Sequence, residues 1–228
     1  MILPKHIGLI MDGNRRWAKE KGRPTFLGHR QGYEVLKKIP DWLYARGVKY
    51  ITTWAFSTEN WKREKEEVSY LLNLFREAFK RDFQKYANDG YKILISGRIS
   101  DFPADIQELS QEITEKTKNN QKATLNVGLS YGGRAEIIDA VKGIIQDNLS
   151  AEKITPDVFQ KYLYQPDLPD IDLVVRTSGE QRLSGFSPWQ SVYAEIIFLK
   201  KYWPDFNEED VDFVLEEFSK RQRRFGGG

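Results

Sequence analysis

The chain has 228 residues, and its 35 lysines and arginines against 33 acidic residues give a net charge of +2. With 40% hydrophobic and 30% charged residues, this composition is typical of a soluble globular protein and excludes a bilayer-spanning or disordered chain. The absence of cysteine excludes disulfides and thiolate sites, and two histidines, His6 and His29, are too few for an all-histidine zinc site. Because the net charge is small, we expect no nucleic-acid partner, and any anionic ligand must be held by locally gathered cations.

The chain shows no sign of targeting to or through a membrane. Residues 1–10 are too short and wrongly flanked for a secretory signal, and no apolar run approaches the ~20 residues of a membrane span. We therefore expect a cytoplasmic protein. No repeat, low-complexity tract or flexible linker divides the sequence, so residues 1–228 are predicted to form a single domain.

Short apolar runs rich in β-branched and aromatic residues alternate with longer amphipathic stretches. The short runs predict strands at residues 7–11, 50–56, 91–95, 123–127, 172–175 and 194–198. The longer stretches predict helices at residues 33–45 (interrupted at Pro40), 66–88, 105–118, 135–148 and 208–221. This alternation predicts an α/β fold with a mainly parallel central sheet of about six strands flanked by helices. Ligands of such sheets bind beyond the carboxyl ends of the strands.

Polar and basic residues follow the first predicted strand, in the segment Met11-Asp12-Gly13-Asn14-Arg15-Arg16-Trp17. The Asp, Gly and Asn are equally typical of an ordinary turn before a helix. However, a glycine turn at a helix N-terminus also offers N–H groups to phosphate, and arginine matches phosphate oxygens. A carboxylate beside phosphate needs a bridging cation, usually Mg²⁺. The segment therefore indicates a magnesium–phosphate site.

Related clusters follow three later strands. The second strand leads into residues 56–63, where Ser57 or Thr58 is also typical of an ordinary helix cap. The fifth strand leads into the Gly/Ser-rich residues 176–184. The sixth carries Glu195 in an apolar segment, which requires either a salt bridge or a metal. Together the strand ends predict a polyphosphate and metal site on one rim, although the sequence contains neither a P-loop nor a dinucleotide-binding motif.

These motifs, in this order, resemble those of the cis-prenyltransferases of the undecaprenyl diphosphate synthase type. The resemblance runs from His6 to Gly226 and rests on the segments 11–17, 28–29, 56–61 with Arg63, 130–134, 176–184, 189–190 and 193–195. It implies a Mg²⁺-dependent enzyme that condenses isopentenyl diphosphate onto an allylic prenyl diphosphate such as farnesyl diphosphate. The implied product is a polyprenyl diphosphate with cis double bonds, such as undecaprenyl diphosphate, whose growing chain occupies an apolar tunnel.

The resemblance also implies roles for individual residues. Asp12 and Glu195 would be the Mg²⁺ ligands, with Asp12 assisting ionisation of the allylic diphosphate. Asn60 would be the proton acceptor, but a neutral amide is a poor base, so we hypothesise that it orients water or the departing diphosphate. The residues implied to bind the allylic diphosphate are Gly13, Asn14, Arg15 and Arg16, with His29 nearby and Trp17 packing at the site. The substrate site would be completed by Ser57, Thr58, Glu59, Trp61 and Arg63. The diphosphate of isopentenyl diphosphate would be held by Arg176, Arg182 and Ser184, and Leu183 is a further implied substrate contact.

The sequence departs from the family pattern at one site position. Many bacterial relatives carry an arginine where this chain has Thr25, and Arg23 two positions earlier would compensate. We keep both residues as predicted substrate contacts.

The tunnel walls are predicted after the second strand and along the helix that follows it. The candidates, all of which are also typical of an ordinary core, are Ala55, Tyr70, Leu71, Leu74, Phe75, Ile95 and Leu125. Tyr70 is bulky and is predicted to shorten the tunnel, so that Tyr70→Ala would lengthen the product.

The resemblance further implies a homodimer, with residues 196–202 and the following helix as its predicted interface. The tail Arg224-Phe225-Gly226 would reach toward the partner's site. A lipid product would also bring the tunnel mouth into peripheral contact with membranes.

Three other classes fit the sequence less well. A trans-type prenyl synthase would be all-helical with D-D-x-x-D motifs, which are absent. A non-catalytic scaffold subunit of a cis-prenyltransferase complex would have lost residues of the first motif, whereas this chain retains them. A nucleic-acid binder using residues 220–224 would need a more basic chain, and a basic helix end complements the helix dipole.

Overall fold

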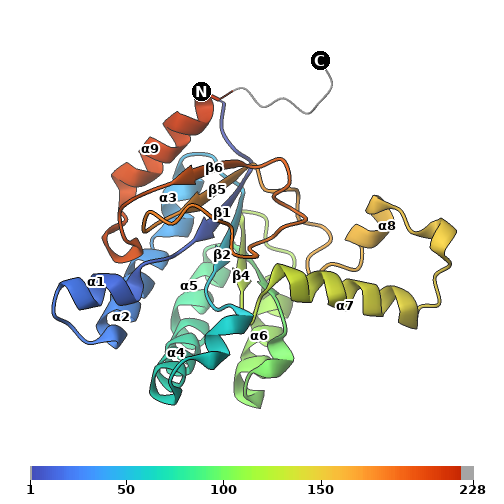
Figure 1. Ribbon diagram of the computed structural model, residues 1–228, viewed down its shortest axis with the longest axis horizontal. Coiled ribbons are helices and arrows are strands. Elements are labelled where there is room, and N and C mark those ends of the chain that lie inside the picture. The colour runs from blue at the N-terminus through green and yellow to red at the C-terminus, as the bar shows by residue number, and fades with distance from the viewer. Residues whose placement is uncertain (1, 222–228) are drawn as a thin grey trace.

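Six strands form one parallel sheet at the centre of the computed structural model, which describes residues 2–221 (Figure 1). The strands are β1 (His6–Ile10), β2 (Tyr50–Trp54), β3 (Lys92–Ser96), β4 (Thr124–Gly128), β5 (Leu173–Arg176) and β6 (Glu195–Phe198). Their order is β3-β4-β2-β1-β5-β6, and every neighbouring pair is parallel. The predicted α/β class and all six predicted strands are confirmed, with boundaries shifted by one or two residues.

The central strand β1 sets the position of the site. All five of its residues are buried, because helices cover both faces of the sheet. Its register pairs Ile10 with Arg176 of β5 and Leu9 with Thr53 of β2, so these three strands end at nearly the same level. Strand β2, which follows β1 in the chain, lies on one side of β1, and β5 lies on its other side. Because the connections run in opposite directions from β1, a crevice forms at its carboxyl end.

Nine α-helices are found within residues 2–221. They are α1 (Asn14–Glu20), α2 (Thr25–Leu36), α3 (Ile39–Ala45), α4 (Lys65–Glu77), α5 (Phe83–Asn88), α6 (Ala104–Thr117), α7 (Gly133–Gln146), α8 (Pro156–Gln160) and α9 (Glu208–Ser219). The predicted helix 33–45 is interrupted as expected, and Pro40 lies in the first turn of α3, where its missing N–H breaks no helical bond. The predicted helix 66–88 is α4 and α5 joined by a π-helical turn, Ala78–Asp82.

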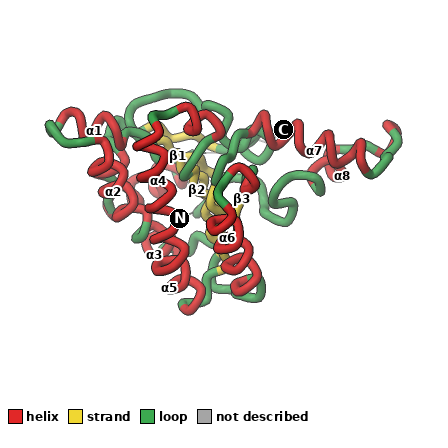
Figure 2. Tube along the Cα trace, turned by 90° about the horizontal axis from the view of Figure 1, so that it is seen from below, coloured by secondary structure: helices red, strands yellow, loops and turns green. Residues whose placement is uncertain are grey.

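Helices α1 to α5 gather toward one end of the molecule, whereas α7 and α8 form an arm that projects from the other end (Figures 1 and 2). Helix α1 is the helix expected after the turn that ends the first strand, although its length was not predicted. Helix α8 and the first half of α2 were not predicted, because α8 is short and the start of α2 has little apolar periodicity. None of the helices within residues 2–221 is long and apolar enough to cross a membrane.

Candidate active site

The chain turns sharply between β1 and α1. Gly13 has a φ of 111°, in the left-handed region that favours glycine, and a Cβ there would lie 2.6 Å from the ring of Tyr202. The turn directs Asp12 into the crevice and starts α1 at Asn14. Helix α2 packs closely on this turn, since a Cβ at Gly28 would lie 2.1 Å from the Asn14 carbonyl oxygen. The predicted strand–turn–helix unit is therefore present.

Two arginines bind the Asp12 carboxylate. Arg176 donates from Nη2 to Oδ2 at 2.8 Å, and Arg16 Nη2 lies 3.3 Å from the same oxygen. Burial by itself would raise the pKa of Asp12. The hydrogen bond and charge of Arg176, together with the charge of Arg16, have the larger combined effect and hold this pKa below its usual value. Asp12 is thus an anion, ready to bind a cation.

The loop after β5 is fastened to the same site. Arg176, whose side chain is only 5% exposed, donates from Nη1 to Ser184 Oγ at 2.9 Å and to the Arg182 carbonyl at 2.5 Å. Arg16 donates to Glu180 at 2.7 Å, and Glu180 also accepts from Arg182 at 2.5 Å. The arginines of β5 and α1 therefore hold residues 176–184 over the end of β1.

A second charged cluster lies across the crevice, centred on Glu67 of α4. Its Oε1 lies 2.9 Å from His29 Nε2 and accepts from Arg63 Nη1 at 3.0 Å, while its Oε2 is 3.8 Å from Arg15 Nε. Burial lowers the pKa of His29, which the hydrogen bond with Glu67 partly offsets. Glu67 was not among the predicted site residues, because Arg63 precedes the helix that carries Glu67 and His29 comes from another helix.

A cavity lies between these two charged clusters, and some of their residues line it. Of the predicted site residues, it brings together Asp12, Gly13, Asn14, Arg15, Arg16, His29, Asn60 and Arg63. The cavity continues into an apolar one, and the two share Met11, Asn14, His29, Trp54, Ala55 and Leu71. The combined space has a cationic mouth and an apolar interior, which suits a molecule with an anionic head and a hydrocarbon tail.

Asn60 lies in the 3₁₀ turn Thr58–Lys62. Its Oδ1 accepts from the backbone N–H of Ser57 at 3.0 Å, so the side chain caps its own turn while it lines the cavity. The Asn60 amide does not ionise, and its oxygen already accepts a hydrogen bond. The side chain is therefore suited to orienting a neighbouring group rather than to removing a proton.

The two predicted tryptophan contacts point elsewhere. Trp17 is buried and donates from Nε1 to Asp205 at 2.7 Å, which anchors α1 to the turn before α9. Trp61 donates to Ser130 Oγ at 2.9 Å and packs on Phe56 with ring centroids 4.9 Å apart. Neither tryptophan lines the cavity.

Several other predicted contacts surround the cavity without lining it. Thr58 packs on the backbone at Gly132, and Arg23 lies over the ring of Trp17. Leu183 packs in a small apolar cluster with Phe186. The remaining residues of this group, which also do not line the cavity, are Thr25, Ser57, Glu59, Arg176, Arg182 and Ser184.

The prediction that strand six delivers Glu195 to the rim is wrong for a single chain. Glu195 begins β6 and pairs in register with Leu173, the first residue of β5, whereas Asp12 follows the last residue of β1. It accepts from Arg221 at 2.8 Å, which is the salt bridge that the sequence left open. Lys220 pairs with Glu216 at 2.8 Å, so the described part of the basic segment 220–224 is engaged within the chain.

The apolar cavity contains four of the predicted tunnel residues, Ala55, Leu71, Leu74 and Phe75. Leu125 and Ile95 belong to the core instead. Tyr70 also lies outside the cavity lining, because its ring packs on Phe26 of α2 with centroids 5.7 Å apart. The expected shortening of the tunnel by Tyr70 therefore has no structural basis.

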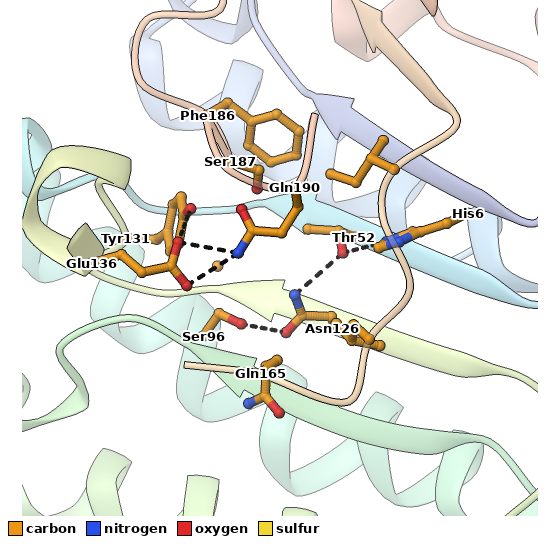
Figure 3. Close-up of a pocket in the computed structure, with 13 residues that line it drawn as sticks. His6, Thr52, Ser96, Asn126, Tyr131, Glu136, Gln165, Phe186, Ser187 and Gln190 are labelled. Atoms are coloured by element: carbon orange, nitrogen blue, oxygen red, sulfur yellow. Dashed lines mark hydrogen bonds between the residues drawn. The ribbon is translucent and has the colours of Figure 1, made fainter. Parts of the chain in front are cut away.

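A small polar cavity lies between the sheet and the loop before β6, and Figure 3 shows its hydrogen bonds. Glu136 accepts from Gln190 and, at 2.5 Å, from Tyr131, and burial raises the pKa of this carboxyl. At the other end, His6 contacts Thr52 Oγ1 at 2.8 Å. Through Gln190 and Glu136, the network fastens the loop before β6 to α7.

Comparison with known proteins agrees with this geometry. A family model described as putative undecaprenyl diphosphate synthase matches residues 10–226. The isoprenyl transferase of Thermotoga maritima is 47% identical over 229 residues, covering 100% of this chain and 98% of that protein. The ditrans,polycis-undecaprenyl-diphosphate synthase of Micrococcus luteus, named as (2E,6E)-farnesyl-diphosphate specific, is 43% identical. The match covers 99% of this chain and 92% of that protein.

The crystal structure of lavandulyl diphosphate synthase from Lavandula x intermedia, in complex with dimethylallyl diphosphate, has a TM-score of 0.94 and 30% identity, with 99% of each chain covered. The fold and the site thus define a prenyltransferase of the cis type. The chain belongs to the undecaprenyl diphosphate synthase family.

Proposed function

We propose that the protein condenses isopentenyl diphosphate with an allylic prenyl diphosphate, and that farnesyl diphosphate is the primer and undecaprenyl diphosphate the product. The continuity of the cationic mouth with the apolar cavity carries this proposal, because it accommodates a diphosphate head and a prenyl tail in one space. The name of the Micrococcus relative supports farnesyl diphosphate as the primer. Retention of Asp12, Asn60 and Arg63 in the cavity favours an enzyme over a scaffold subunit.

The residues fit Mg²⁺. Asp12 supplies a hard carboxylate oxygen beside phosphate-binding arginines, and Mg²⁺ is commonly bound by one or two carboxylates with substrate phosphates and water. No group of three or more metal-ligating side chains occurs within residues 2–221, so most ligands would come from the substrate and water. Glu195 of the same chain would not contribute. When bound, Mg²⁺ would neutralise charge on the diphosphate.

The chemistry requires the allylic C–O bond to break and diphosphate to leave. The alkene of isopentenyl diphosphate then forms the new C–C bond, and a proton is lost from the resulting cation. Arg15 and Arg63 would stabilise the charge that develops on the departing diphosphate. Asn60 would orient that group, whose own oxygens can accept the proton. The apolar wall excludes water, which would otherwise capture the cation.

We also propose that the protein is a cytoplasmic homodimer. Three apolar side chains, Ile138, Val141 and Ile145, are exposed on α7 at spacings of three and four residues, which places them on one face of the projecting arm (Figure 1). A second copy would cover this face, which replaces residues 196–202 and α9 as our proposed dimer interface. Charged diphosphate substrates do not cross membranes freely, which supports a location in the compartment that supplies them.

Incubation with labelled isopentenyl diphosphate, farnesyl diphosphate and Mg²⁺ tests the proposal. We expect incorporation of label into organic-soluble product, abolished by chelation and reduced at least about 10²-fold by Asp12→Asn. If the wild-type protein incorporates no label with any allylic primer, the enzymatic function is refuted.

A further inference from the structure

The hairpin of α1 and α2 exposes two neighbouring apolar side chains. Phe26 is 46% and Leu27 38% exposed, and both lie in the first turn of α2. The ring of Phe26 contacts Tyr70 of α4, so the exposed surface continues from α2 toward α4. These side chains form a small apolar surface beside the ligand cavity.

The same hairpin carries a local excess of positive charge. Residues 15–30 contain six basic residues and one acidic residue, although the whole protein has a net charge of only +2. Beyond the arginines that line the site, Lys19, Lys21 and Arg23 are exposed. The single acid, Glu20, accepts a hydrogen bond from Tyr202, and outside the hairpin Asp205 lies 3.3 Å from Lys21 Nζ. This surface therefore complements an anionic partner.

The hairpin also lies directly against the path of the hydrocarbon. His29, Gly32, Tyr33 and Leu36 on α2 line the apolar cavity, while the first turn of the same helix exposes Phe26. The hairpin is at one end of the molecule, remote from the α7–α8 arm that we assign to dimer contact (Figures 1 and 2). A surface bound here would lie close to the cavity without obstructing a second subunit.

We propose that the α1–α2 hairpin docks on an anionic lipid bilayer, with Phe26 and Leu27 inserted at the interface and the basic residues against lipid head groups. The combination favours a bilayer over a nucleic acid, which would use the cations but not the apolar pair. Apolar insertion and charge attraction are each weak alone, and together they give reversible binding. The inference rests on the proposed function, because docking here would deliver a lipid product to the membrane.

Vesicle sedimentation tests the docking surface. We expect the full-length protein to sediment with vesicles of phosphatidylcholine and phosphatidylglycerol, but not with phosphatidylcholine alone, and to dissociate as salt is raised. Phe26→Ser/Leu27→Ser and, separately, Lys19→Glu/Lys21→Glu should each weaken binding by about fivefold or more. Phe213→Ser, which removes an aromatic side chain of similar exposure from α9, is the matched control and should bind normally.

Turnover of detergent-solubilised farnesyl diphosphate separates this inference from the proposed function. All three variants should keep wild-type turnover there, whereas the two hairpin variants should be slower when the allylic substrate is presented in anionic vesicles. The inference is overturned if the wild type does not bind anionic vesicles, if both hairpin variants bind as the wild type does, or if salt-sensitive binding needs the lysines but not Phe26 and Leu27. Absence of turnover in detergent by the wild type would instead refute the proposed function.

Discussion

Arg176 Nη2 donates to Asp12 Oδ2 across 2.8 Å and thereby joins the ends of β5 and β1. The same guanidinium holds Ser184 and the Arg182 carbonyl through Nη1, so one buried side chain keeps Asp12 ionised and positions the loop after β5. Arginine is suited to this task because its planar fork donates in several directions at once.

Arg176→Lys should lower kcat by about 10²-fold while leaving the fold intact, since lysine keeps the charge but cannot span both partners. Steady-state kinetics and a thermal melt would measure the two effects. Arg46→Lys alters an exposed ion pair between α3 and α9 and serves as the control, with turnover expected to stay within about twofold. Wild-type kcat in the Arg176 variant would show that the link is dispensable.

Glu67→Gln should destabilise the protein by about 1–3 kcal/mol, because it leaves Arg63 and His29 without their partly buried counter-charge. Inorganic diphosphate should then stabilise the variant more than it stabilises the wild type, since it supplies the missing negative charge. Denaturant unfolding with and without diphosphate measures both. Glu77→Gln, which removes the charge that faces the more exposed Arg30, should cost under about 1 kcal/mol and gain no extra stabilisation.

Ala78→Leu should shorten the product, because Ala78 lines the apolar cavity and a larger side chain occupies space needed by the hydrocarbon. Tyr70→Ala should leave chain length unchanged, since Tyr70 packs on Phe26 outside that lining. Thin-layer chromatography of the dephosphorylated products compares the two. If Tyr70→Ala made longer products and Ala78→Leu made products of unchanged length, the apolar cavity would not be the site that holds the hydrocarbon.

Much of the fold and part of the site could be predicted from sequence. The six strands were predicted from short apolar runs. Asp12 was predicted as a site residue because it lies in a glycine turn after the first strand. Glu195 was misplaced because an apolar run does not reveal whether a residue begins or ends a four-residue strand, and the two ends lie at opposite edges of the sheet.

Tertiary contacts explain the other differences. Trp17 and Trp61 adjoin polar motifs in sequence, yet their rings face the interior and their N–H groups bind Asp205 and Ser130. Glu67 was overlooked because its role depends on His29, which a different helix brings to it. Such contacts are set by helix packing and are not encoded in local spacing. The tail 224–226 lies outside the described residues.

His6 should make the protein acid-sensitive. Burial lowers its pKa from 6.5 to about 4, because the neutral ring fits between the Pro169 carbonyl and Thr52. As the pH falls from 6.5 toward 4, the unfolded chain gains a proton that the native state does not, so the free energy of unfolding drops by up to about 3 kcal/mol. In His6→Asn this part of the pH dependence should disappear. Denaturant titrations across this range would contradict the account if both proteins lose stability in parallel.

We propose that this cavity elongates an allylic diphosphate with cis double bonds. The most direct measurement is the mass and double-bond geometry of the product formed from farnesyl diphosphate, labelled isopentenyl diphosphate and Mg²⁺. We expect a polyprenyl diphosphate in which every newly formed internal double bond is cis, and no such product from Asp12→Asn. Newly formed trans double bonds, or a wild-type protein that leaves both substrates unchanged, would contradict it.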